Sequence, residues 1–260
     1  MQMINSHCGV TRDARGVVRL AISNAGSLTI LNSTVIKAVV EGLTTLAADA
    51  DIRALILTGG TEKSMIGGAD IKEMATLDQA SAERFISGLR DLCEAVRNFP
   101  APIIARMPGW CLGGGLEVAA ACDFRVAAAD AKFAMPEVRV GIPSVIHAAL
   151  LPRLIGWGRA RWLLMTAATI DAPTALDWGL IDVVAADGEP LDDAVERVIE
   201  MLLECGPQAL RNQKALLRQW EDLPLKESVE VSIGAFGRSY LTDEPRRLMQ
   251  EFIDRKRGGK

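Results

Sequence analysis

Two glutamates, Glu117 and Glu137, are the residues whose type and surroundings best suit acid–base chemistry. Each lies in an otherwise apolar stretch, LEVAA around Glu117 and MPEV around Glu137. Two carboxyl groups that meet in one pocket can divide acid and base work, because repulsion and poor solvation raise at least one pKa. Taken singly, each glutamate is more typical of a helix end or a charged surface. Their spacing of 20 residues leaves open whether they meet in space.

Three successive glycines, Gly113 to Gly115, stand just before Glu117. The apolar run after them predicts a helix, so the glycines lie at its N-terminus, where free N–H groups and the helix dipole favour an anion. Without a Cβ, the backbone there can approach a ligand closely. Such a site suits a negative charge that develops only in a transition state. The same glycines are equally typical of a tight turn that packs a helix on a strand.

Several common reaction classes lose support because their motifs are missing. The chain has neither a G-x-G-x-x-G dinucleotide fingerprint after its first strand, nor a phosphate-binding G-x-x-x-x-G-K-[ST], nor a G-x-S-x-G hydrolase elbow. It contains 2 histidines, His7 and His147, which disfavours a multi-histidine metal site. Its 5 cysteines form no C-x-x-C pair. We therefore expect no bound metal.

Composition narrows the setting in which the protein works. Of 260 residues, 49% are hydrophobic and 24% charged, as in ordinary globular proteins, and the net charge is −4. That charge favours neither nucleic acid nor an anionic membrane, so we expect no partner of either kind. No signal peptide or membrane span is visible. An odd number of scattered cysteines is typical of a reducing compartment, which predicts a cytoplasmic protein.

The elements that must position these residues alternate between strand and helix. Short β-rich runs are predicted near 17–23, 52–58, 102–107, 123–128 and 131–135, with amphipathic helices near 32–46 and 81–99. This alternation predicts an α/β body with parallel strands over residues 1–190. Helical patterns follow, near 159–166 and 191–204, then from Pro207, and from Asp243 as an N-cap. We therefore expect a helical C-terminal region over residues 191–260.

Three motifs together resemble the enoyl-CoA hydratase/isomerase, or crotonase, superfamily. They are IGGADIKEM (66–74), PIIARMPGWCLGGGLEVAAACDFRVA (102–127) and KFAMPEVRVGI (132–142), and the later ALDWGLI (175–181) is similar too. The likeness covers nearly the whole chain, in order and at the length of the family. The motifs are highly specific for the superfamily and much less so for one reaction within it.

The resemblance implies a spiral of repeated ββα units with C-terminal helices that mediate trimers, often paired into hexamers. It implies an acyl-CoA thioester as substrate, with coenzyme A as part of that substrate and no separate cofactor. By motif position, the backbone N–H groups of Ala69 and Gly114 form the oxyanion hole, and Glu117 and Glu137 match the two hydratase glutamates. The substrate-binding positions implied are Gly68, Asp70, Ile71, Lys72 and Gly113.

These features favour an enoyl-CoA hydratase, a lyase in which Glu117 acts as base on water and Glu137 delivers a proton to C2 of a trans-2-enoyl-CoA. An isomerase or another crotonase chemistry on the same oxyanion hole stays open, as does a non-catalytic scaffold on this fold. The loop Ser144–Leu151 departs from the family, because Ser144 replaces a glycine and later glycines are absent. His147 in that loop is interpreted as a packing or surface histidine, with a place in the acyl pocket as the alternative.

Overall fold

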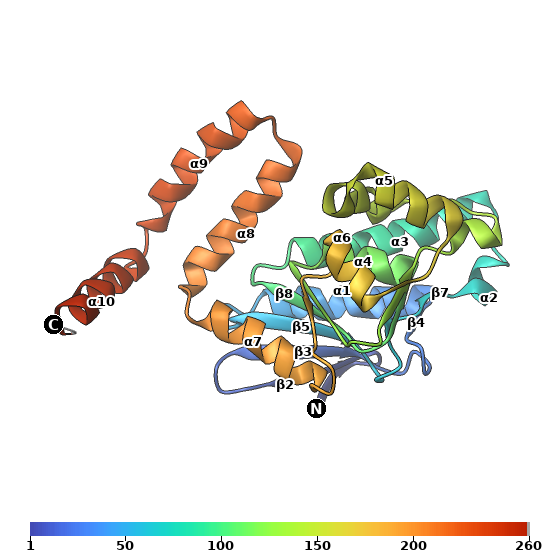
Figure 1. Ribbon diagram of the computed structural model, residues 1–260, viewed down its shortest axis with the longest axis horizontal. Helices are drawn as coiled ribbons and strands as arrows, with labels where there is room; N and C mark the ends of the chain where they lie inside the picture. The colour runs from blue at the N-terminus through green and yellow to red at the C-terminus, as the bar shows by residue number, and fades with distance from the viewer. Residues whose placement is uncertain (259–260) are drawn as a thin grey trace.

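A twisted sheet of seven strands forms the centre of the computed structural model, which describes residues 1–258 (Figure 1). In spatial order its strands are β1 (Gln2–Asn5), β2 (Cys8–Arg12), β3 (Val17–Ile22), β5 (Ala54–Gly59), β8 (Ile103–Met107), β10 (Phe124–Ala127) and β13 (Val183–Val184). From β3 to β13 every pairing is parallel, as predicted. The β1–β2–β3 pairings are antiparallel, because the turns between them are too short for a crossover.

A smaller sheet lies beside the main one, and the chain alternates between the two sheets. Its order is β12 (Ile170–Asp171), β11 (Lys132–Ala134), β9 (Trp110–Leu112) and β6 (Ser64–Ile66), and β4 (Ile30–Leu31) pairs separately with β7 (Gly68–Ala69). Each of β5, β8 and β10 is followed by one strand of the smaller sheet and then by helical structure. This is the ββα repeat that the resemblance implies.

Helices α1 (Ser33–Ala47) and α3 (Gln79–Arg97) cover one face of the main sheet. Helix α4 (Gly114–Ala121) lies against α3 on one side and against β6, β7 and β9 on the other. Helix α1 begins where the Asn32 side chain accepts a hydrogen bond from the Val35 N–H at 2.8 Å. Helix α3 begins with a reciprocal capping box between Asp78 and Ser81. Both bury one apolar stripe, so the amphipathic patterns predicted from the sequence are confirmed.

Helix α5 (Leu151–Thr166) starts earlier than predicted. The sequence indicated a short helix at 159–166, whereas helical structure begins at Leu151 and bends at Gly156, whose φ is +76°. A glycine tolerates this positive φ, and with ψ at 156° its backbone is not helical, so two helical segments meet there at a kink and the predicted helix belongs to the second. Helix α6 (Ala172–Trp178) then leads back to β13.

The last four helices fall into two groups. Helix α7 (Leu191–Leu203) packs on the other face of the main sheet, where Val195, Val198 and Ile199 meet Ile56, Ile104 and Val126. Helices α8 (Pro207–Asp222), α9 (Leu225–Ser239) and α10 (Glu244–Gly258) extend away from the body, to the left in Figure 1, and we call them the C-terminal arm. The division into regions at residue 190 stays a prediction, and its last two residues lie outside those described. Within residues 1–258, no helix combines the length and apolar character needed to cross a bilayer.

Candidate active site

The glycine turn lies at the N-terminus of α4, as the sequence predicts. Gly113 is the N-cap residue, with φ at +54°, and its N–H donates to the Ala134 carbonyl in β11 at 2.9 Å. Every residue of α4 is buried, so this helix has no polar face. Gly114 is the first helical residue, and a first N–H has no acceptor inside its own helix. The α4 N-terminus thus offers a free donor in a site that is largely shielded from water.

The segment that carries Ala69 runs alongside this turn. A Cβ on Gly68 would come 3.4 Å from the Leu112 carbonyl oxygen, and one on Gly115 would come 2.7 Å from the Ile66 Cβ. Gly115 has no room for a side chain against Ile66, and the φ of +113° at Gly68 likewise favours glycine. The Asp70 N–H, next along the chain, donates to Leu31 in β4 at 2.9 Å. Since successive N–H groups of extended backbone alternate in direction, the Ala69 N–H faces away from β4.

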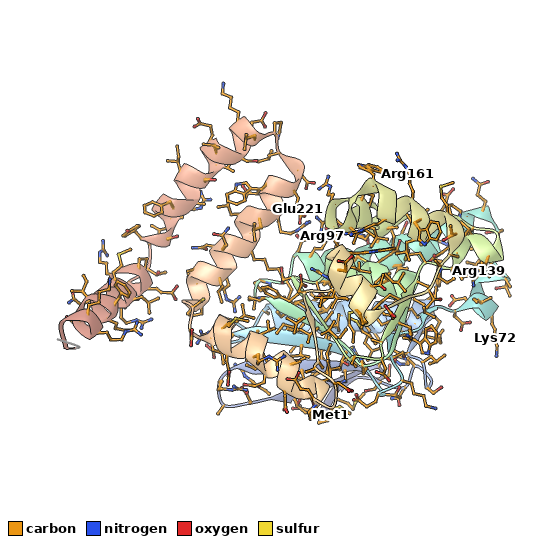
Figure 2. The ribbon with its side chains drawn as sticks, in the orientation of Figure 1. Met1, Lys72, Arg97, Arg139, Arg161 and Glu221 are labelled. Carbon is orange, nitrogen blue, oxygen red and sulfur yellow. The ribbon has the colours of Figure 1, made fainter. Side chains whose placement is uncertain are left out.

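Asp70, Ile71 and Lys72 lie around the short helix α2 (Ile71–Met74). The Asp70 side chain caps this helix by accepting from the Lys72 N–H at 2.8 Å. Ile71 is 60% exposed. The Lys72 side chain extends from the edge of the molecule in Figure 2. Asp70 is half-buried and Ile71 and Lys72 are exposed, whereas Glu117 is buried.

Glu117 is buried in the first turns of α4, with 3% of its surface exposed. Its Oε1 accepts a hydrogen bond from the Ala148 N–H at 3.0 Å. Burial, together with the nearby charge of Glu137, raises the pKa of Glu117 to about 8, although hydrogen bonds from the backbone of Ala148 and of Val145 oppose the rise. A carboxyl group in this setting can hold or release a proton near neutral pH.

Glu137 opens the short 3₁₀ helix η1 (Glu137–Val140) and lies beside the glycine turn. Its Oε1 comes 2.5 Å from where a Cβ on Gly113 would stand, and the Glu117 N–H donates to the Gly113 carbonyl at 3.1 Å. Burial raises the pKa of Glu137, and a hydrogen bond from the Ser144 hydroxyl at 2.9 Å counteracts that rise. The Glu137 carboxyl thus lies beside Gly113 and close enough to the Glu117 carboxyl for its charge to act on it, a proximity that the spacing in the sequence left open.

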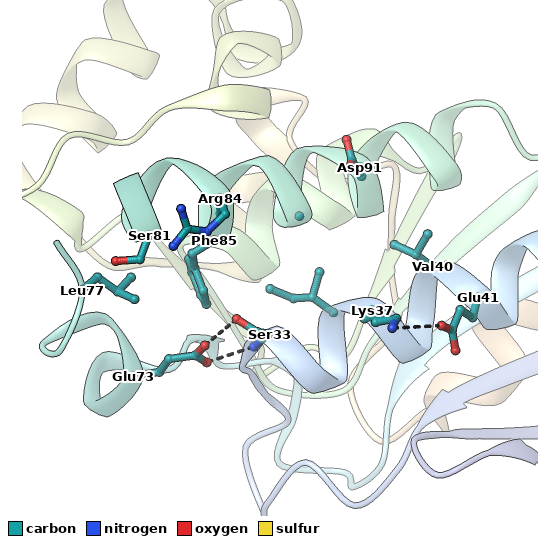
Figure 3. A pocket seen from close by; sticks show the side chains of 12 residues that line it. Ser33, Lys37, Val40, Glu41, Glu73, Leu77, Ser81, Arg84, Phe85 and Asp91 are labelled. Atoms are coloured by element: carbon teal, nitrogen blue, oxygen red, sulfur yellow. Dashed lines mark hydrogen bonds and ion pairs between the residues drawn. The ribbon is translucent and has the colours of Figure 1, made fainter. Parts of the chain in front are cut away.

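An open groove of about 560 Å³ lies outside this site, between α1, α2 and α3 (Figure 3). Neither glutamate lines it. At one end, the Glu73 carboxylate accepts from the Ser33 N–H at 2.9 Å and from the Ser33 hydroxyl, as the dashed lines in Figure 3 show. These bonds tie α2 to the start of α1 and so fix the loop that carries Ala69.

Three contacts of the site were not found from the sequence. They are the Ala148 N–H on Glu117, the Ser144 hydroxyl on Glu137, and the hydrogen bond of buried His147 with Glu94, in which His147 Nε2 and Glu94 Oε1 lie 2.8 Å apart. The interpretation of His147 as a packing residue is incomplete, because this side chain is 6% exposed and holds a carboxylate. Among residues 1–258, no group of three or more His, Cys, Asp or Glu side chains is arranged to hold a metal.

Comparison with known proteins decides the family. The family described as enoyl-CoA hydratase/isomerase matches residues 12–258. This chain belongs to that family. It is 32% identical over 239 residues to a crotonyl-CoA hydratase from Syntrophomonas wolfei, covering 92% of each chain. It is 31% identical over 242 residues to a short-chain-enoyl-CoA hydratase from Clostridium acetobutylicum, covering 93% of this chain and 92% of that protein.

Solved structures agree with this membership. The crystal structure of an enoyl-CoA hydratase from Bacillus anthracis superposes with a TM-score of 0.90 at 29% identity, covering 96% of this chain and 97% of that one. An enoyl-CoA hydratase from Mycobacterium smegmatis superposes with a TM-score of 0.91 at 26% identity and similar coverage. The crotonase fold predicted from the three motifs is therefore confirmed.

Proposed function

We propose that this member of the family is an enoyl-CoA hydratase, which adds water across a trans-2-enoyl-CoA thioester. The observation that carries the proposal is the proximity of two carboxyl groups, buried Glu117 and half-buried Glu137, beside a glycine turn. Hydration needs a base for water and an acid for carbon, and two carboxyls of raised pKa can supply both. The names of the relatives, hydratases in each case, support the same reaction class.

The free backbone donors supply the electrophilic part of the reaction. We assign the Gly114 N–H, at the start of α4, and the Ala69 N–H to an oxyanion hole for the thioester oxygen. When water attacks C3, negative charge develops on that oxygen, and donors positioned beforehand stabilise it. In other enzymes one such donor lowers the barrier by about 3 kcal/mol. Gly68 and Gly113 let the backbone come close to the thioester, and Asp70, Ile71 and Lys72 bind the coenzyme A portion at the rim.

Before water is added, the two glutamates share one proton in this cycle, which Glu137 carries. Glu117, as carboxylate, takes a proton from water while the water oxygen bonds to C3, and Glu137, as acid, delivers its proton to C2. The proton taken by Glu117 then returns to Glu137 and restores the pair. The Ala148 N–H stabilises the carboxylate form of Glu117 in the reactive arrangement, because a hydrogen bond to the charged form favours it. No cofactor enters this cycle.

The assay that tests the proposal follows the conjugated thioester absorbance of short, medium and branched enoyl-CoAs. Hydration removes this absorbance, whereas isomerisation of a 3-enoyl-CoA creates it. We expect Glu117→Gln and Glu137→Gln each to lower turnover by about 10²- to 10⁴-fold, the usual cost of losing a general acid or base. Glu83→Gln, on the exposed face of α3, serves as the control. Full turnover in both site variants would refute the catalytic assignment. If the wild-type protein turned over none of the thioesters, that result would favour a scaffold role.

We also propose that the chain assembles as a trimer, or as a hexamer of two trimers, in the cytoplasm. The C-terminal arm exposes large apolar side chains, among them Leu225 at 82%, Ile233 at 68% and Phe236 at 67%. Several large apolar side chains exposed on one helix are typical of an interface between protein chains. A second and third copy would cover α9 and α10, which lie away from the body beyond α8 (Figure 1).

A further inference from the structure

His147 lies one residue before the donor that supports Glu117. It belongs to the short 3₁₀ helix η2 (Ile146–Leu150), and the Ala148 N–H that follows it donates to the Glu117 carboxylate at 3.0 Å. The His147 side chain is buried, and its Nε2 lies 2.8 Å from Glu94 Oε1 in α3. The backbone donor for Glu117 is therefore anchored to α3 through an adjacent side chain.

The chemistry of this contact defines the state of the imidazole. A carboxylate only accepts hydrogen bonds, so Nε2 carries the hydrogen and donates to Glu94. The other ring nitrogen, Nδ1, is buried and has no hydrogen-bond partner among the described residues. Burial lowers the pKa of His147, although the Glu94 carboxylate opposes this change. The imidazole is therefore a neutral ring whose Nε2 donates to Glu94 Oε1, while Arg97 Nη1 lies 3.4 Å from the same nitrogen.

The segment that His147 holds is strained. Ile146, directly before it, has φ at +38°, which a β-branched residue rarely adopts. The helix η2 also has no side-chain cap at its start. A backbone in such a conformation persists only where surrounding groups fix it. The bond from His147 to Glu94 is a group of this kind, because it ties the strained turn to a long helix.

Glu94 is in turn fixed by two arginines that reach the C-terminal arm. Arg97 lies 3.3 Å from Glu94 and also pairs with Glu221 of α8, and Figure 2 shows Arg97 and Glu221 facing each other between α3 and α8. Arg218 of α8 lies 3.6 Å from Glu94 and pairs with Glu221 as well. The Arg97 side chain is 12% exposed, so this network is screened less by water than a surface pair.

We infer that His147 is a positioning residue for Glu117: its bond to Glu94, supported by Arg97 and by α8, keeps the Ala148 N–H on the Glu117 carboxylate. The inference rests on the proposed hydratase function for its kinetic test. His147 need not touch substrate, since it acts through the backbone of the next residue. The arm and the catalytic carboxyl are thereby linked through one chain of polar contacts.

The charged and titratable groups around this unit determine how it responds to pH. His147 is faced by Glu94 and Arg97 of α3 and by the charge of Glu221 of α8. Glu117 is faced by Glu137 of η1, and its charge in turn acts on Cys93 of α3. Loss of the Ala148 N–H removes the group that opposes the raised pKa of Glu117, so this pKa rises further. A variant that releases η2 must therefore move the pH dependence of catalysis upward.

The test compares His147→Ala with His147→Gln, whose amide can still donate to Glu94. For His147→Ala we expect kcat on crotonyl-CoA to fall about tenfold, with KM little changed. We also expect the alkaline limb of the pH profile of kcat/KM, which the high pKa of Glu117 governs, to move upward by about one unit. His147→Gln should recover most of the rate and the original profile. His7→Ala is the matched control, because His7 bonds the Ser23 carbonyl far along the chain from Glu117.

A uniform loss of rate in His147→Ala with an unmoved pH profile would overturn the inference, since a merely structural role predicts that result. Should His147→Ala fail to fold, Glu94→Ala removes the acceptor instead, and the same upward movement is expected. A second readout needs no turnover: infrared difference spectra of the Glu117 carboxyl, assigned with Glu117→Gln, titrate that group directly. An unmoved carboxyl titration overturns the inference, while wild-type protein inactive on every enoyl-CoA overturns only the hydratase function.

Discussion

The carboxyl of Glu117 is fully hydrated, and ionises at its ordinary pKa, only when the chain unfolds. In the folded chain, burial and the charge of Glu137 raise its pKa from 4.5 to about 8. Below pH 4.5 the group is protonated in both the folded and the unfolded chain, so its ionisation does not lower the stability of the fold. As the pH rises toward 8, the unfolded chain releases the proton and the folded chain retains it, so the stability of the fold decreases across this window.

Replacing this carboxyl is therefore expected to stabilise the protein while removing activity. For Glu117→Gln, the free energy of unfolding relative to wild type should increase between pH 5 and pH 8.5 by about 2 to 4 kcal/mol. Urea unfolding at the two pH values measures this difference. Glu83→Gln, on exposed surface, should show no such change. An equal difference at both pH values would contradict the burial of a protonated Glu117.

Ser144 modifies the pKa of Glu137. Its hydroxyl donates to Glu137 Oε2 at 2.9 Å and lowers the pKa of that carboxyl against the effect of burial. For Ser144→Ala we expect the pKa of Glu137 to rise, so the acid limb of the pH profile of kcat/KM moves upward by up to about one unit. Ser27→Ala, on exposed surface, provides the comparison. A fixed acid limb would mean that Ser144 contributes only to packing.

At the scale of elements, the site depends on how closely α4 approaches β6. A Cβ on Gly115 would overlap the Ile66 carbonyl oxygen and lie 2.7 Å from the Ile66 Cβ. Backbone cannot yield as a flexible side chain can, so a larger residue must push the start of α4 away from the strand. That displacement would separate the Gly114 N–H from the Ala69 segment.

Gly115→Ala is accordingly expected to destabilise the fold by about 1 to 3 kcal/mol, the usual cost of overpacking. Turnover should fall further than stability alone explains, because one oxyanion donor is misplaced. Thermal unfolding and steady-state kinetics check the two effects. Gly158→Ala, in α5 with open space around it, should be neutral or slightly stabilising. Similar behaviour of the two variants would argue against the close approach.

The elements that sequence periodicity could predict are those with one apolar face. Helices α1, α3 and α7 bury a stripe and expose the rest, so their spacing was informative. Helix α4 is buried all round, and only its resemblance to a family motif and the glycines before it indicated its place. The two-residue strands β4 and β7 carry no period at all, and they form because tertiary packing places them side by side.

Contacts between distant parts of the chain were beyond sequence reasoning. The resemblance placed Ala69, Gly114 and both glutamates near one another, yet neither spacing nor residue type indicated that Glu94 pairs with His147, 53 positions away. That pairing depends on how η2 packs against α3, and α3 was predicted without any partner for its polar face. The same holds for Lys214, which reaches Asp123 at 2.6 Å and docks α8 on the body.

At the scale of the whole molecule, the C-terminal arm leaves large apolar side chains in water. Ile233 and Phe236 of α9 are both more than half exposed. If three copies cover these surfaces, charged residues there must weaken assembly. For the double variant Ile233→Asp, Phe236→Asp we expect a fall in mass from trimer or hexamer to monomer, measured by sedimentation or light scattering. Lys226→Asp changes the net charge of the same helix by −2, as the double variant does, without removing a large apolar side chain, and it should assemble as wild type. A monomeric wild-type protein would refute the assembly.

The buried carboxyl of α4 also has a consequence for anyone who selects variants of this protein. A library of variants screened for heat resistance at alkaline pH should be enriched in amides and apolar residues at position 117, because these residues avoid a destabilising buried carboxylate. Survivors of such a screen would be robust and inert. A useful selection must therefore demand turnover in every round, so that durability is gained at other positions.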